Sequence, residues 1–177
     1  MDVYLIPPEY VRQVYPNIDE FMDRLVPTTH GRFDKVDILH DMLTAKEHLW
    51  VVVKEDKETI VGMILTEITV YPRKRMLSIQ YAAGDQLDEW MEEALRVLEN
   101  WAVDNECTGM EITGRRGWVK KLKLHKWEEE FVVVKKEGLK KAELKIVESE
   151  KTDGQKKRRR NTSNTTGRVK NLSKQTS

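Results

Sequence analysis

The sequence has one cysteine, four histidines and no long apolar run, and each scarcity excludes a class of protein. Cys107 has no second cysteine with which to form an intramolecular disulfide, and the histidines lack the spacing of metal ligands, so we expect no metal site. No stretch reaches the roughly 20 apolar residues that cross a bilayer, and the N-terminus lacks the pattern of a signal peptide. We therefore expect a cytoplasmic protein with no membrane partner.

Charge is divided unevenly along the chain. Residues 151–177 contain nine Lys and Arg but one acidic residue, which leaves 22 basic and 29 acidic residues in 1–150, a net charge of −7. The tail has too few apolar residues to fold alone, so we expect it to be disordered. Its basic cluster would attract nucleic acid or an acidic protein partner, or the tail would fold back weakly onto the acidic body. The cluster comprises Lys156, Lys157, Arg158, Arg159 and Arg160.

The pattern of apolar residues predicts one domain of mixed helices and strands. Runs rich in β-branched and apolar residues predict strands at 3–7, 49–53, 59–71, 76–83, 109–113 and 129–137. The three middle strands follow one another through short polar turns, which is typical of an antiparallel meander. We therefore predict an α/β (α+β mixed) fold, with a mostly antiparallel central sheet and helices on both faces. The domain is predicted over 1–137, followed by an extension at 138–150 and the disordered basic tail at 151–177.

Helical spacing predicts four helical regions between these strands. The first follows Pro8 and is expected to break at Pro16, with Asn17 as the cap of the next helical segment. The second spans 33–45, the third begins after Asp85, and the fourth lies within 114–127. The expected apolar face of the second helix comprises Phe33, Val36, Leu39 or His40, and Leu43; that of the third comprises Leu87, Trp90, Met91, Ala94, Leu95, Leu98, Trp101 and Ala102.

The segment IQYAAGDQLDEW at 79–90 connects a strand to the long helix through one glycine, Gly84. Such a junction can bind a phosphate, because a helix N-terminus offers free N–H groups and positive dipole charge. Asp85, Asp88 and Glu89 would instead repel an anion. The other interpretation is that Asp85 caps the helix and the two acids stabilise its first turn.

This order of elements, with GRRGWVKKLKLHKWEEEFVVVKKE at its end, resembles the GNAT N-acetyltransferase fold over about 1–137. YLIPPEYV, LWVVV, VYPRKRML and GRRGW look like small GNAT-like proteins of tailed bacteriophages, some encoded among virion or head-assembly genes. The resemblance implies acetyl-CoA in the cleft between strands 76–83 and 109–113, with its pyrophosphate on the turn at 82–86. The residues that would bind the coenzyme are Ala82, Ala83, Gly84, Gln86, Arg115 and Arg116.

Two departures from the family pattern lower the expected activity. The usual phosphate turn is Gln/Arg-x-x-Gly-x-Gly/Ala, whereas residues 81–86 read YAAGDQ and retain one glycine. The family's tyrosine proton donor lies five residues before an aromatic residue; with Trp127 in that place, Leu122 replaces the tyrosine. We therefore expect weaker coenzyme binding and no usual proton donor.

Glu67 and Tyr81 are the candidate catalytic residues. A carboxylate on a central strand can take a proton from an amine, often through water, and this role fits Glu67 or, second, Glu111. Tyr81 can donate a proton to a thiolate or pack in the core. Alternation along the strands leaves open which face each carboxylate occupies.

Three functions compete on the sequence alone. The leading hypothesis is a phage-type GNAT-like protein with a degenerate acetyl-CoA site, which acts in virion assembly or as a binding module with phage structural proteins as partners. The alternative is an active acetyl-CoA-dependent N-acyltransferase on an unknown amine. The third is a protein that binds nucleic acid through its basic tail. The expected location is the bacterial host cytoplasm, with association to the virion under the first hypothesis.

Overall fold

The structure of the chain is a computed structural model that describes residues 1–114 and 116–130. The predicted strand at 129–137 lies almost entirely outside these residues. The extension at 138–150 and the basic tail at 151–177 also lie outside them.

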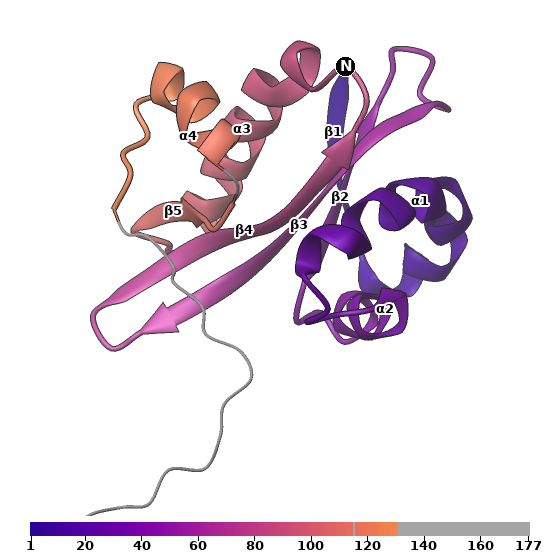
Figure 1. Cartoon of the computed structure of the whole chain (residues 1–177), viewed down its shortest axis with the longest axis horizontal. Coiled ribbons are helices and arrows are strands. Elements are labelled where there is room, and N and C mark those ends of the chain that lie inside the picture. Colours follow the sequence, from indigo (N-terminus) through magenta and orange to yellow (C-terminus); the bar gives the residue numbers. More distant parts are fainter. Residues whose placement is uncertain (115, 131–177) are drawn as a thin grey trace, which may run out of the picture. The chain divides into compact units, whose positions relative to one another are not determined.

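The described residues form a five-stranded sheet whose strands are in sequence order (Figure 1). The strands are β1 (Asp2–Ile6), β2 (His48–Val53), β3 (Ile60–Tyr71), β4 (Lys74–Gly84) and β5 (Gly109–Ile112). Each neighbouring pair from β1 to β4 is antiparallel, which confirms the predicted meander. The last pair, β4 and β5, is parallel because a helix connects the two strands.

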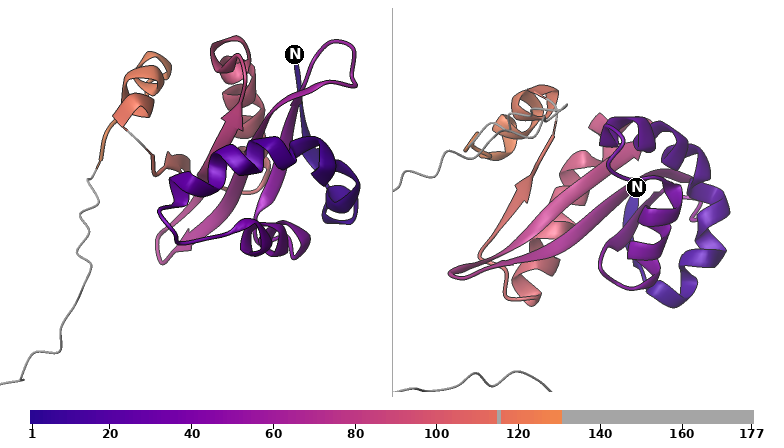
Figure 2. Two further views of the ribbon diagram at one scale, coloured as in Figure 1. Left: turned by 45° about the vertical axis from the view of Figure 1, so that its right-hand side comes forward. Right: turned by 60° about the horizontal axis from the view of Figure 1, so that its bottom comes forward.

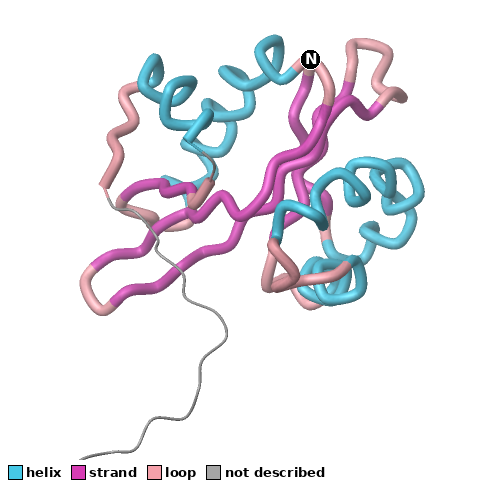
Figure 3. Tube along the Cα trace, in the orientation of Figure 1, coloured by secondary structure: helices cyan, strands magenta, loops and turns pink. Residues whose placement is uncertain are grey.

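Strand β4 pairs with β5 over only part of its own length. Met76–Ile79 pair with Gly109–Ile112, and β4 then continues to Gly84 beyond the end of β5 (Figure 3). Just after the paired part, Leu65 of β3 lies opposite Tyr81, but Thr66 lies opposite Ile79. Gln80 is therefore the extra residue of a β-bulge, which re-aims the end of β4.

Helices cover both faces of the sheet (Figure 2), as predicted. α1 (Val11–Leu25) and α2 (Lys35–Leu43) pack on one face, together with the short 3-10 turns η1 (Pro8–Tyr10) and η2 (Val26–Thr29). α3 (Leu87–Asp104) and α4 (Arg116–Leu122), which is followed by η3 (Lys123–His125), pack on the other. We call these the α1/α2 face and the α3 face. The predicted apolar stripe of α3 is confirmed, since all eight of its residues pack in the α3-face core.

The predicted break at Pro16 is wrong. Pro16 lies inside the continuous helix α1, and both Pro16 and Asn17 are exposed. Proline removes one helical N–H, but on the solvent side water can hydrate the carbonyl that loses its partner. The exposed position explains why the helix continues through the proline.

The predicted apolar face of α2 is only partly right, since Leu39 and Leu43 pack partly buried against the α1/α2-face core. Ile38 and Met42 are the buried residues of this helix, whereas Val36 is 73% exposed and His40 lies in solvent. The helix starts later than predicted because Asp34 caps it. The Asp34 side chain accepts from the backbone N–H groups of Val36 and Asp37, which fixes the first turn and therefore the face that meets the sheet.

Candidate functional site

Gly84 in the turn between β4 and α3 is required by strand packing. A Cβ at this position would lie 2.6 Å from the Gly62 Cα and 2.7 Å from the Val61 carbonyl oxygen. The same carbonyl accepts the Asp85 N–H at 2.8 Å, so β3 and the turn are held in close contact. The absence of a side chain at Gly84 is explained by this contact without any bound anion.

Asp85 does not cap α3, so that part of the interpretation is wrong, whereas Asp88 and Glu89 do lie in the first turn of the helix. The N-cap is Gln86, which has a positive φ of 54° and makes no side-chain capping bond. The Asp85 carboxylate instead accepts from Arg24 Nη1 of α1 at 2.7 Å. This hydrogen bond lowers the pKa of Asp85. The backbone oxygen of Asp85 accepts from the Trp90 indole N–H at 2.8 Å, which ties the turn to the α3-face core.

An ion pair connects the first turn of α3 to α4. Lys121 donates to the carboxylate of Asp88, and no other ion pair of the described residues joins these two helices. The GNAT resemblance places the coenzyme beside the following helix, α4. Two carboxylates, Asp85 and Asp88, therefore flank the turn where the family binds a pyrophosphate.

The space between α3, α4 and the sheet is small and apolar. A cavity of about 20 Å³ is lined by twelve hydrophobic side chains, which include Ala82, Leu87, Trp118 and Leu122. This volume holds about one water molecule. Trp118 and Leu122 line this cavity together with Ala82, which lies on the part of β4 that extends past β5.

The structure brings together only part of the predicted coenzyme set. Ala82 lines the apolar cavity, whereas Ala83 packs in the core on the α1/α2 face. Gln86 donates its amide N–H to Glu89 Oε1 at 3.0 Å. Arg115 lies outside the described residues, as does the side chain of Arg116.

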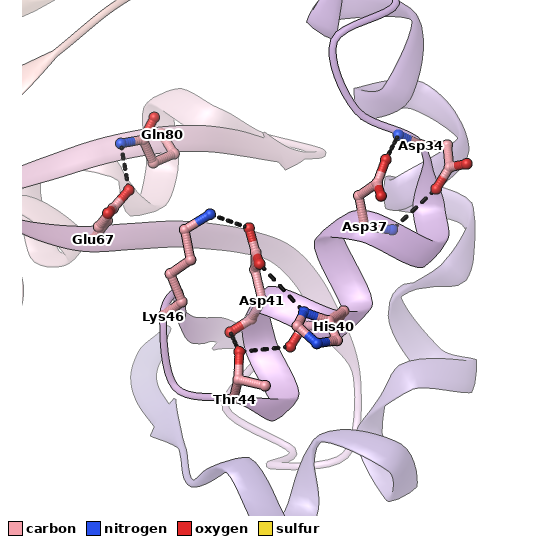
Figure 4. A network of polar contacts seen from close by, with 8 residues as sticks. All are labelled: Asp34, Asp37, His40, Asp41, Thr44, Lys46, Glu67 and Gln80. Carbon is pink, nitrogen blue, oxygen red and sulfur yellow. Dashed lines mark hydrogen bonds and ion pairs between the residues drawn. The ribbon is translucent and has the colours of Figure 1, made fainter. Parts of the chain in front are cut away.

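The two predicted catalytic residues lie on the α1/α2 face. Tyr81 packs beside the α1/α2-face core, where Phe33 meets it edge to face with ring centroids 6.4 Å apart. Glu67 accepts from the Gln80 amide at 3.3 Å (Figure 4). Burial raises the pKa of Tyr81, and the charge of Glu47 adds to this effect. The charge of Glu67 also acts on Glu47, so the three residues form one electrostatic cluster.

Glu47 is a candidate residue that the sequence interpretation missed. It is only 7% exposed, and its Oε2 atom is buried without a hydrogen-bond partner. The pKa of Glu47 is raised to about 7, chiefly by burial and also by the charges of Asp41 and Glu67, while the charge of Lys46 opposes them. The sequence did show an acid directly before the apolar strand HLWVVV. It did not show the strand register, which places this acid beside other polar side chains.

Lys46 does not neutralise this cluster fully, because its amine is bonded to another acid. Lys46 Nζ donates to Asp41 Oδ2 at 2.6 Å (Figure 4), and this bond lowers the pKa of Asp41. The buried carboxyl of Glu47 is therefore left beside a cation that is already paired.

A second polar group surrounds Glu111 on β5. The hydroxyls of Ser78 and Tyr71 both donate to Glu111 Oε1, the latter at 3.0 Å. Thr69 Oγ1 lies 2.7 Å from Ser78 Oγ and completes the group. The bond to Glu111 raises the pKa of Tyr71.

Residues 1–114 and 116–130 contain neither a metal cluster nor a membrane helix. Nowhere in this part of the chain do three or more His, Cys, Asp or Glu side chains gather closely enough to hold a metal ion. No helix there is long and apolar enough to cross a membrane.

Comparison with known proteins identifies the fold. No protein-family model matches the chain, and no curated protein sequence matches it either. Among solved structures, a probable acetyltransferase superposes with a TM-score of 0.59 at 9% identity, covering 84% of this chain and all of the other. The aminoglycoside N-acetyltransferase AAC(6')-Iy in complex with CoA gives a TM-score of 0.57 at 13% identity, covering 78% of this chain and 95% of the other.

A third solved structure is similar in the same way. The aminoglycoside acetyltransferase meta-AAC0020, from an uncultured soil metagenomic sample, superposes with a TM-score of 0.55 at 13% identity, covering 78% of this chain and 96% of the other. These neighbours are GNAT acetyltransferases. The predicted GNAT-like fold is therefore confirmed.

Proposed function

We propose that this protein is a GNAT-shaped binding module whose acetyl-CoA site is degenerate. The proposal rests on one observation, that acidic side chains and a small apolar cavity lie where the β4–α3 turn would hold the coenzyme. The two carboxylates at the turn are engaged in ion pairs with Arg24 and Lys121. The adjoining space is an apolar cavity of about 20 Å³.

Both features oppose a coenzyme for physical reasons. A diphosphate needs empty, positive space at the helix N-terminus, and the carboxylates of Asp85 and Asp88 add negative charge there. A pantetheine arm needs an open channel along β4. To make that channel, the side chains of Trp118 and Leu122 would have to leave their packed positions, which would expose apolar surface to water.

The test is calorimetric titration of the full-length protein with acetyl-CoA. We expect no binding below about 1 mM, which corresponds to a free energy weaker than about −4 kcal/mol. Micromolar affinity, about −8 kcal/mol, would contradict the proposal and favour an enzyme.

A pair of double variants tests the reason for weak binding. We expect Asp85→Asn/Asp88→Asn to strengthen acetyl-CoA binding, because it removes two negative charges from the turn. Glu92→Gln/Glu99→Gln removes the same charge from the exposed side of α3 and is the matched control. Equal gains in both variants would mean that net charge, not the turn, limits binding.

We propose virion assembly as the setting in which the module acts, with phage structural proteins as partners. The resemblance to GNAT-like proteins of tailed bacteriophages supports this setting. Mass spectrometry of purified particles tests it: we expect the chain in the particles or in their assembly intermediates. Its absence from both would overturn this setting.

An active N-acyltransferase is the second candidate, and the cluster of Glu47, Glu67 and Tyr81 favours it. A carboxyl whose pKa is about 7 is suited to proton transfer at neutral pH. The test is thiol release from acetyl-CoA with a panel of primary amines. Turnover that is lost in Glu47→Gln would favour this candidate, and no turnover with any amine would favour the binding module.

A further inference from the structure

Three glutamates lie in one row across the sheet on the α1/α2 face. His48 of β2 pairs with Thr66 of β3, so continuation of this antiparallel register sets Glu47 opposite Glu67. Glu67 in turn pairs with Ser78 of β4, and Ser78 pairs with Glu111 of β5. The row across these strands therefore reads Glu47, Glu67, Ser78, Glu111, and we call it the acidic row.

The members of the acidic row share one face because their neighbours pack on the other. Leu77 and Ile79 flank Ser78, Met110 and Ile112 flank Glu111, and all four lie in the α3-face core. The His48 ring, next to Glu47, packs on Trp101 of α3 with ring centroids 4.8 Å apart. Since side chains alternate along a strand, the acidic row projects to the α1/α2 face.

Strand spacing sets the distances between the carboxylate positions. Neighbouring strands are about 4.8 Å apart. The backbones of Glu47 and Glu67 are therefore about 5 Å apart, and those of Glu67 and Glu111 about 10 Å apart because β4 lies between them.

The charge of Lys46 acts on Glu47 and Glu67, but its amine donates to Asp41 and so neutralises the row only in part. Glu67 accepts from an amide and Glu111 from two hydroxyls, which are all neutral donors. Glu47 has a buried oxygen with no donor at all. A buried carboxylate without a partner is costly, so a ligand that supplies positive charge there gains free energy that a surface ion pair would not.

We propose that the acidic row binds a linear aliphatic polyamine. Three or four methylene groups separate the ammonium groups of such a molecule, which are therefore about 5–6 Å apart for bond lengths of about 1.5 Å. One ammonium group fits between Glu47 and Glu67, and the next ones follow the row toward Glu111. A compact metal ion fits less well, because it needs several carboxylates at one point. This inference concerns the α1/α2 face and does not depend on the state of the coenzyme turn.

Binding to this site is coupled to a proton. The groups that act on Glu47 are Asp41 of α2, Lys46, and Glu67 of β3, while Tyr81 of β4 faces it as well. An ammonium group favours the charged form of Glu47, so below pH 7 the bound polyamine displaces a proton. Affinity therefore rises as the pH increases from 5.5 to 8.

The experiment is calorimetric titration of the full-length protein with spermidine at pH 8 and physiological salt. We expect spermidine to bind at least tenfold more tightly than butylammonium, which carries one charge. Glu47→Gln and Glu111→Gln should each weaken binding severalfold. Glu55→Gln, in the exposed connection at the opposite end of β2, should leave it unchanged.

Proton release distinguishes the site from general attraction to an acidic protein. Titration at pH 6.5 in buffers of different ionisation enthalpy should show proton release in the wild type and little in Glu47→Gln. Circular dichroism confirms that the variants are folded. Absence of spermidine binding would overturn the proposal, and so would equal losses in Glu47→Gln and Glu55→Gln. Acetyl-CoA affinity is measured separately, so failure here leaves the proposed function untouched.

Discussion

The two faces of the sheet differ in whether the acidic side chains near the β4 bulge have partners. On the α3 face, hydrophobic side chains line a cavity of about 20 Å³, and the carboxylates of Asp85 and Asp88 at the β4–α3 turn are held in ion pairs. On the α1/α2 face, a buried carboxyl of Glu47 has an oxygen with no partner. The polar groups of the two faces are therefore in different states, since those at the β4–α3 turn are paired and the buried oxygen of Glu47 is not.

The largest loss of stability is expected from adding a side chain at Gly84, where β4 enters the turn before α3. Gly84→Ala adds a Cβ that would overlap backbone atoms of Gly62 and Val61, and neither can move as a flexible side chain does. We expect a loss of about 3 kcal/mol or more in the free energy of unfolding, measured by chemical denaturation.

Gly117→Ala is the matched control for that variant. Gly117 lies in α4, and a Cβ there meets no atom within 4 Å. Alanine is the better helix former by about 1 kcal/mol, so this variant should be neutral or more stable. A Gly84→Ala protein as stable as the wild type would show that β3 and the turn are not in close contact.

The next largest effect is expected from Glu47 on the α1/α2 face. The pKa of Glu47 rises from 4.5 to about 7 on folding, so the folded state holds its proton more tightly. The stabilisation is fully present below pH 4.5 and is lost as the pH rises to about 7. From the size of the shift, this loss is about 3 kcal/mol.

Glu47→Gln should remove this dependence on pH. The difference in unfolding free energy between the variant and the wild type should therefore increase from pH 4.5 to pH 7 in favour of the variant. Denaturation at several pH values measures it, with Glu55→Gln as the exposed control. Parallel curves for all three proteins would contradict the burial of an unpartnered carboxyl.

The smallest change in stability is expected when Asp34, which caps a helix, is compared with Asp85, which does not. Asp34 caps α2 through two backbone N–H groups, so Asp34→Ala should cost about 1 kcal/mol. Asp85 makes an exposed ion pair instead, so Asp85→Ala should lower the melting temperature by less than Asp34→Ala does. A larger decrease for Asp85→Ala than for Asp34→Ala would contradict this account and indicate that Asp85 caps α3.

Local patterns were sufficient for the five described strands and for α3. The stripe that contains Trp90 and Leu98 has an unambiguous period, and its side chains pack as expected. Pro16 was misleading because the sequence does not show that its side of α1 faces water. The face of α2 depended on the Asp34 cap, which moves the start of the helix by one or two residues.

The candidate site depended on pairing between distant strands. Glu67 and Glu111 could be assigned to strands, but their shared face results from the register that pairs Glu67 with Ser78 and Ser78 with Glu111. Glu47 was missed because it lies just before a strand, where the local sequence does not reveal that the side chain is buried in the fold. Asp85 bonds to Arg24, 61 residues earlier in the chain, and no local pattern reveals such a pair.

The contrast between the two faces is best tested by an NMR titration of the ¹⁵N-labelled full-length protein with acetyl-CoA and, separately, with spermidine. We expect spermidine to shift the amide signals around Glu47, Glu67 and Glu111, and acetyl-CoA to leave the signals of 84–88 unchanged. Saturable shifts at 84–88 with acetyl-CoA, and none along the acidic row with spermidine, would contradict the assignment of binding to the α1/α2 face.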